Sequence, residues 1–345
     1  MGQPSIYEQI FFGFLLSTLS MALPEVITMN DPIPWIRPTG YVLGYPVYGL
    51  HILVLGGLMY KYSRMGIVTL MSYGGLFGLY EGYLIKQLWN PNWGAELTLQ
   101  IGGVRVVHTL MLVFFVHPML AFVVPLVIAE LFLARPGSLS RALPSLRTRT
   151  GVIATVIGLA VWLGLIIGSN LPKHGGRSAF AAPVISILVI GTLAAIWIFI
   201  FKGNRFSIRE LMPQGKGLWI LAGLLVVEYV FYCRLLRPEA MPSEWLPHVI
   251  VVGMYVFFVT LIILWGKPKE AAGRLEEDVV NTSRASWRLG VLGACIFLLI
   301  AFVHAGAEEP GGVVAITSFL GGGAVNFSFL VVCFFVGGYR WLRRK

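Results

Sequence analysis

Residues 104–133 read VRVVHTLMLVFFVHPMLAFVVPLVIAELFL, a run dominated by Leu, Val and Phe. A helix needs about 20 mostly apolar residues to cross a bilayer, so this run is long for one crossing. Pro118 and Pro125 lie inside it, and we therefore expect a kink or a strong tilt. The run predicts a helix whose solvent is lipid.

Nine further apolar segments accompany this one. They lie at about 7–24, 41–60, 65–88, 151–170, 180–201, 217–236, 246–266, 287–306 and 312–338. The loops between them are too short to be soluble domains. We therefore predict an all-α fold, a polytopic integral membrane bundle of about ten transmembrane helices that forms a single membrane domain over residues 1–345. The loop near 134–150 separates candidate sub-bundles 1–134 and 150–345.

The composition indicates the same class of protein. Hydrophobic residues make up 57% of the chain and charged residues 12%, whereas about 25% charged residues is usual in soluble domains. The net charge of +10 indicates basic cytoplasmic loops and no nucleic-acid partner, because the chain holds no long basic run. The cysteines, Cys233, Cys295 and Cys333, have neither a disulfide framework nor a zinc spacing. We expect no metal and no cofactor, with the lipid bilayer as the main partner.

The basic residues are distributed unevenly between the predicted loops. If both termini are cytoplasmic, 19 of the 26 Lys and Arg residues lie inside and 7 lie outside. Cytoplasmic loops of membrane proteins carry an excess of Lys and Arg. A miscount by one span would scatter this distribution, so it supports both the number ten and the orientation. We expect a prokaryotic cell membrane with the N-terminus and the C-terminus inside.

The predicted third span carries Gly74, Gly78 and Gly82 at intervals of four residues. Small residues at this spacing form a stripe that allows another helix to pack closely in lipid. Glu81 lies about 20° from Gly74 around the helix, so we expect it to face protein. An intramembrane carboxylate is costly and is a candidate functional group, with a structural ion pair or hydrogen bond as the alternative.

Other polar residues lie within the spans. His51 and Tyr48 are too deep to belong to an interfacial aromatic belt. His108 and His117 are about 180° apart around their helix, so one metal ion cannot bind both. Polar groups that run from the outer surface to the midplane would suit an outward-facing cavity, and scattered structural roles are the alternative. The candidates for a substrate or proton pathway are Glu81, His108, His51, His117, Glu228, Arg105 and Asn326.

Glu81 and His108 lie at comparable depth on helices that are consecutive in the chain. The Trp89–Trp93 loop joins these helices, so we predict that both residues face a cavity in the outer half beneath that loop. A carboxylate and an imidazole there could exchange a proton between solvent and a bound solute. A buried pair that only ties two helices together is the alternative.

Three functions fit this pattern. A ten-helix bundle without an extramembrane domain favours a transporter or permease for a small solute. A transferase or hydrolase acting on a lipid-linked substrate at the outer face is the second hypothesis, with Glu81 or Asp31 as the acid–base group and Arg37 or Arg105 as a phosphate clamp. A non-catalytic membrane subunit of a larger complex is the third.

The topology predicts that Ser138 and Ser243 lie on opposite sides of the membrane. In a background without Cys233, Cys295 and Cys333, an impermeant maleimide added to intact cells should label a Ser243→Cys variant. A Ser138→Cys variant should react only after permeabilisation. Labelling of both positions from the same side would contradict the topology.

Overall fold

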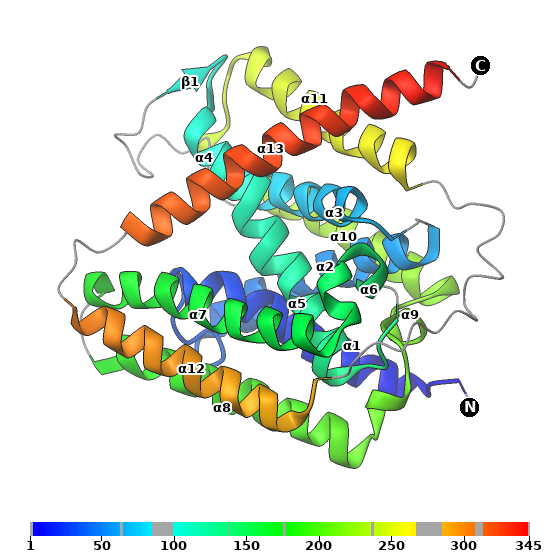
Figure 1. Ribbon diagram of the computed structural model, residues 1–345. Helices are drawn as coiled ribbons and strands as arrows, with labels where there is room; N and C mark the ends of the chain where they lie inside the picture. The colour runs from blue at the N-terminus through cyan, green and yellow to red at the C-terminus, as the bar shows by residue number, and fades with distance from the viewer. Residues whose placement is uncertain are drawn as a thin grey trace.

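The chain folds into a bundle of helices (Figure 1). A computed structural model describes residues 3–62, 65–84, 99–137, 139–174, 177–235, 238–266, 285–307 and 313–343. The longer helices are α1 (Ile6–Ile27), α2 (Tyr45–Tyr62), α3 (Ile67–Leu79), α7 (Arg149–His174), α8 (Arg177–Ala195), α10 (Gly215–Leu235), α11 (Trp245–Trp265), α12 (Trp287–Gly306) and α13 (Val313–Leu342). The fourth predicted span is built from α4 (Val106–Met111), η3 (Leu112–Val123), α5 (Val124–Ile128) and η4 (Ala129–Leu133).

Shorter helical pieces extend or connect these helices. They are η1 (Gly40–Gly44), η2 (Tyr80–Leu84), α6 (Leu139–Ala142), η5 (Pro144–Arg147), η6 (Ile196–Ile200), η7 (Gly203–Arg205), α9 (Ile208–Leu211) and η8 (Pro238–Ala240). The predicted all-α class is confirmed, with one small exception in a hairpin of β1 (Gln100–Ile101) and β2 (Val104–Arg105). Its turn residues Gly102 and Gly103 have φ of +57° and +78°, which suits a two-residue hairpin turn.

Among the described residues, nine helices are long and apolar enough to cross a membrane. Their ends fall within a few residues of nine of the ten predicted spans. The predicted third span, 65–88, is the exception. Its described part is α3 followed by η2, and Tyr73, Tyr80 and Glu81 make it less apolar than the others. Most of α3 is buried among other helices, so protein rather than lipid surrounds it.

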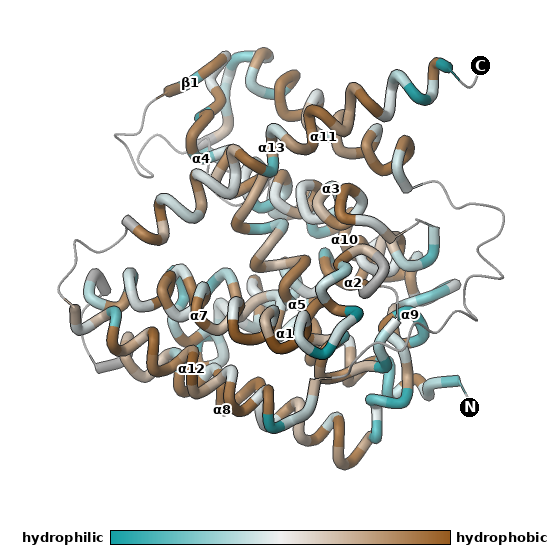
Figure 2. The backbone as a smooth tube through the Cα atoms, in the orientation of Figure 1, coloured by the Kyte–Doolittle hydropathy of each residue, from teal (hydrophilic) through white to brown (hydrophobic). Residues whose placement is uncertain are grey.

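The two termini lie at the same end of the bundle, at the right of Figure 1. Figure 2 shows hydrophilic residues gathered near the N-terminus and α9 at this end. Here Arg205 Nη2 lies 2.7 Å from Glu8 Oε1, and Arg135 Nη2 lies 3.1 Å from Glu210 Oε2. Burial raises the pKa of the Glu210 carboxyl, but hydrogen bonds from Ser207 and the nearby Arg135 cation outweigh this effect and lower the pKa below its usual value. An even number of crossings returns a chain to its starting side, so this arrangement fits the predicted topology. The assignment of this end to the cytoplasm stays a prediction. Ser138, which the labelling experiment uses, lies outside the described residues.

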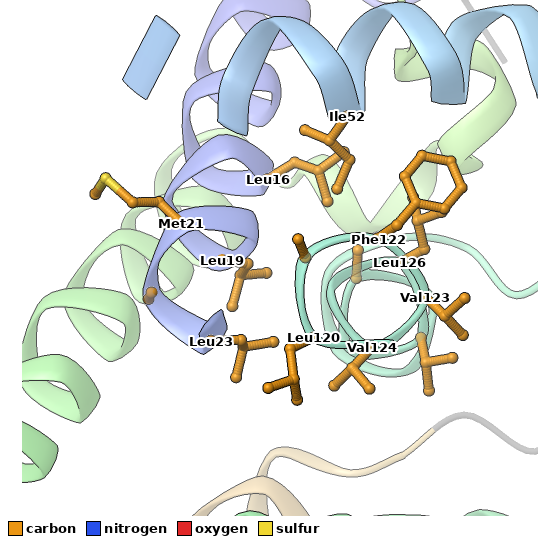
Figure 3. Close-up of a cluster of buried hydrophobic side chains, with 14 of the residues drawn as sticks. Leu16, Leu19, Met21, Leu23, Ile52, Leu120, Phe122, Val123, Val124 and Leu126 are labelled. Carbon is orange, nitrogen blue, oxygen red and sulfur yellow. The ribbon is translucent and has the colours of Figure 1, made fainter. Parts of the chain in front are cut away.

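The hydrophobic core lies between α1 and the helix built from η3 and α5. Leu19 and Leu23 of α1 face Leu120 of η3, as Figure 3 shows, and all three side chains are buried. Ser20 lies in the same contact, and its hydroxyl donates to the carbonyl of Ala121 at 2.6 Å. The candidate sub-bundles 1–134 and 150–345 share interfaces, since α1 contacts α8, α2 contacts α10, and α3 contacts α11.

The fourth predicted span is irregular at its prolines. Its central part, η3, is a π-helix that contains Pro118. Proline has no N–H to donate, and wide turns often form where the helical ladder is interrupted. Figure 1 shows the helix from α4 to α5 crossing the bundle at a steep angle to α7 and α12, as the predicted tilt implies.

The glycine stripe of α3 packs directly on this irregular helix. A methyl group added at Gly78 would lie 2.9 Å from Cα of Val113, and one added at Gly74 would lie 2.7 Å from Cα of Pro118. Both neighbours are backbone atoms, which cannot rotate away. The predicted close contact is therefore confirmed, and its partner is η3.

We expect Gly78→Leu to lower the stability of the detergent-solubilised protein by roughly 1–3 kcal/mol, because the new side chain overpacks the α3–η3 contact. Gly158→Leu on α7 is the matched control, since nothing lies within 4 Å of a methyl group added there. Thermal unfolding of both variants measures the difference. Equal melting temperatures would contradict the importance of this contact.

Candidate functional site

His51 lies on α2 in the interior and is fully buried. Its Nδ1 lies 2.6 Å from the carbonyl oxygen of Val47, and its Nε2 lies 3.2 Å from the hydroxyl of Tyr229 on α10. A carbonyl only accepts, so Nδ1 carries a proton and donates it there. In the neutral ring, Nε2 then accepts a hydrogen bond from Tyr229. The ring also packs on Phe77 and Tyr80, with centroids 4.6 and 4.2 Å away.

Glu228 is a carboxylate one residue before Tyr229 on α10. The hydroxyl of Tyr80 donates to Glu228 Oε1 at 3.2 Å, and the rings of Tyr80 and Tyr229 are 4.3 Å apart. The other carboxylate oxygen, Oε2, is buried and has no hydrogen-bond partner among the described residues. Tyr80 and Tyr229 therefore link the carboxylate of Glu228 to the environment of His51.

Glu25 is a second carboxylate of this region, and the sequence analysis did not single it out. It belongs to the last turn of α1, which ends at Ile27 rather than at the predicted residue 24. Tyr48 of α2 donates to Glu25 Oε1 at 2.6 Å, and Asn30 Nδ2 donates to Oε2 at 2.6 Å. Tyr48 was the signal in the sequence that could have revealed Glu25, because a hydroxyl that deep in the membrane needs a hydrogen-bond partner.

Glu81 is the third carboxylate, and η2 places it in the interior as predicted. Its side chain is buried, and its Oε2 has no hydrogen-bond partner among the described residues. It lies within electrostatic range of the carboxylates of Glu25 and Glu228. Three acidic groups from α1, η2 and α10 therefore face one region. We call this region the central polar cluster; it comprises Glu25, Tyr48, His51, Tyr80, Glu81, His117, Glu228 and Tyr229.

The observed neighbours of Glu81 differ from its predicted partner His108, and the shared cavity of these two residues stays a prediction. The electrostatic neighbours of Glu81 are Glu25 and Glu228, whereas that of His108 is Arg105. The residue that reaches α4 from η2 is Tyr83, whose hydroxyl bonds to Thr109. Residues two positions apart point to roughly opposite sides of a helix, so Glu81 is turned away from α4. The Trp89–Trp93 loop, the predicted roof, lies outside the described residues.

The remaining candidates occupy different places. His117 is buried in η3, where its Nδ1 lies 3.0 Å from the carbonyl of Leu112 and its ring centroid is 6.1 Å from that of Phe77. It also lies within electrostatic range of His51. Asn326 of α13 donates to the carbonyl of Phe114, four residues before Pro118. An α-helical turn would leave that carbonyl without an N–H donor, so Asn326 helps to satisfy the proline-interrupted helix.

Arg37 pairs with Asp31 at 3.6 Å, and Asp31 is itself an electrostatic neighbour of Glu25, so this pair lies beside the cluster. The pairs Arg205–Glu8 and Arg135–Glu210 lie at the end of the bundle that holds the termini. In the described part of the chain, no group of three His, Cys, Asp or Glu residues is arranged to hold a metal ion. The cluster thus combines carboxylates, tyrosine hydroxyls and imidazoles, which are groups that exchange protons.

The comparisons with known proteins concern this whole region. A model described as an uncharacterized membrane protein family matches residues 14–344, which include every residue of the central polar cluster. The chain belongs to this family. It is similar to an uncharacterized protein from Archaeoglobus fulgidus, with 33% identity over 238 residues, which cover 68% of this chain and 70% of that protein. No solved structure matches the chain. With its apolar helices, the family member is a multi-pass integral membrane protein.

Tyr48→Phe should destabilise the protein by about 1–3 kcal/mol, because it removes a hydroxyl donor from the Glu25 carboxylate. Tyr7→Phe is a suitable control, since Tyr7 is 75% exposed. Thermal unfolding in the same detergent compares the variants. If Tyr48→Phe and the native protein have the same melting temperature, the hydrogen bond to Glu25 does not stabilise the folded state.

Proposed function

We propose that this protein is a transporter for a small solute in a prokaryotic cell membrane and that its central polar cluster binds and releases protons during transport. The observation that carries the proposal is the meeting of Glu25, Glu81 and Glu228 inside the bundle. They come from three different helical elements, and Glu81 lies within electrostatic range of both Glu25 and Glu228. Buried oxygens of Glu81 and Glu228 have no hydrogen-bond partner among the described residues.

Electrostatics supports a proton-binding role for these groups. Three negative charges placed close together in a medium of low dielectric repel one another strongly, and each also loses its hydration. Protons, or a cationic ligand, relieve that repulsion. The rings of His51, Phe77 and Tyr80 pack closely within the cluster, which favours the smallest cation, a proton. A gain or loss of one proton then changes the free energy of the contacts between α1, α2, η2 and α10.

The position of the cluster favours coupling to movement of the helices. Tyr80 and Tyr229 bridge Glu228 and His51, so the hydrogen bonds join η2, α10 and α2. Protonation of a carboxylate converts an acceptor into a donor and so changes which partners it prefers. Two packing states that differ in these bonds could expose the cluster alternately to the two sides, which is the requirement for transport.

The enzyme hypothesis receives less support from the geometry. Its acid–base candidate Asp31 pairs with Arg37, which was to be a phosphate clamp. The other acid–base candidate, Glu81, faces Glu25 and Glu228, whereas Arg105 lies beside His108. Arg37 is therefore engaged by Asp31, and Arg105 lies with His108 rather than with Glu81.

Proteoliposomes that contain a trapped pH-sensitive dye test the proposal. When screened with pools of small metabolites, the native protein should show solute-dependent proton movement. Glu81→Gln and Glu228→Gln each keep the shape of the side chain and remove its titration. We expect each variant to lose proton movement by on the order of 10²-fold, the usual effect of removing a proton-transfer group.

Glu239→Gln, at an exposed position in η8, is the matched control and should behave as the native protein does. The Gln variants in the cluster should melt no lower than the native protein, because each replaces a costly buried charge by a neutral amide. Undiminished proton movement in both, or its absence from the native protein with every pool, would overturn the proposal.

A further inference from the structure

A large apolar groove lies on the side of the bundle, outside the central polar cluster. Its volume is about 670 Å³, and it is formed by the β1–β2 hairpin, α4, η3, α11 and α13. Each helix contributes residues spaced for a single face, such as Ile250, Gly253 and Phe257 of α11 and Ala324 and Val331 of α13. Three helix faces thus converge on one space.

Two features mark the ends of the groove. Toward one end, Trp265 of α11 donates from its indole N–H to the carbonyl of Cys333 on α13 at 3.0 Å, so the two helices touch there. Toward the other end α11 and α13 separate, and Figure 1 shows α4 and the hairpin between them. Ile101 and Val104 of the hairpin line the groove at that end.

The lining offers almost nothing for a polar ligand to bind. Thr109 and Ser328 are its hydroxyl-bearing members. The Thr109 hydroxyl donates to the carbonyl of Arg105, so its remaining capacity is as an acceptor for the Tyr83 hydroxyl. The other lining residues are apolar, and α11 and α13 are candidate membrane spans. The occupant therefore has an apolar contact surface.

We infer that this groove binds one hydrocarbon chain of a membrane lipid. From Ala324 to Phe335 the groove extends along α13 for about 16 Å, at about 1.5 Å for each residue. That is about the depth of one leaflet, which is half of the roughly 30 Å hydrocarbon core. A lipid with its headgroup near the hairpin would place one chain along this length. This inference is independent of the proposed transport function.

A partner helix fits the groove less well than a lipid chain does. A membrane-spanning helix needs about 30 Å of continuous contact surface. The residues of α13 that line the groove span only about half that distance. A hydrocarbon chain ends within one leaflet, so a groove of this length suits it.

Photo-crosslinking tests the inference on the full chain reconstituted in phosphatidylcholine vesicles. The probe is phosphatidylcholine with a diazirine on one acyl chain, and mass spectrometry locates the labelled peptides. In the native protein, labelling of the groove faces of α11 and α13 should exceed that of the lipid-facing residues of α10 several-fold. Gly253→Trp, which fills the groove, should lower the groove labelling several-fold.

Gly223→Trp on α10 is the matched control. Gly253 and Gly223 are both exposed, and a methyl group added at either would meet nothing within 4 Å. The control should keep the native labelling, and Gly253→Leu provides a smaller filling variant if the tryptophan prevents folding. Even labelling of all lipid-facing helices, or groove labelling unchanged in the Gly253 variants, would overturn the inference.

Discussion

The interior arrangement depends on the close contact between α3 and η3. Gly74 and Gly78 bring the two backbones together, and a side chain at either position would strike Pro118 or Val113. This contact sets the rotation of α3 about its axis. Phe77 and Glu81 are four residues apart and share a side of that helix, next to the glycine face. Phe77 therefore packs on His51, and Glu81 one turn later faces the carboxylates of α1 and α10.

The same contact shows how the bundle satisfies its polar groups in lipid. Unpaired backbone groups are costly in the membrane interior, and Pro118 interrupts the hydrogen-bond ladder of η3. The carbonyl of Leu112 pairs with His117, and that of Phe114 accepts from Asn326 on α13. Two of the predicted pathway residues thus bond to the backbone around one proline. Oxygens of Glu81 and Glu228 differ from them, because they have no hydrogen-bond partner among the described residues, and they mark where the structure tolerates an electrostatic cost.

The sequence predicted the fold well because lipid imposes strong constraints on it. Apolar length alone located the nine helices of the described residues that could cross a membrane, and the spacing of Gly74 and Gly78 predicted a tight contact. The site was predicted less completely. Helical periodicity correctly predicted that Glu81 faces the interior of the bundle. It could not predict which helix packs against Glu81, because the order of helices in a bundle depends on contacts between residues distant in sequence. Glu25 was missed for a local reason, since α1 continues for one more turn into a segment that resembles a loop.

The helix from α4 to η3 separates the two sites and contributes to both. On one side, His117 approaches Phe77 and the central polar cluster. On the other, Thr109, Leu110 and Phe114 line the apolar groove. Asn326 bonds to the carbonyl of Phe114, so α13, which forms one wall of the groove, is tied to the same helix. A change in the width or rotation of η3 would therefore alter the proton-exchanging groups and the groove together. The π-helical turns of η3 allow such a change, because a single residue separates a π-turn from an α-turn.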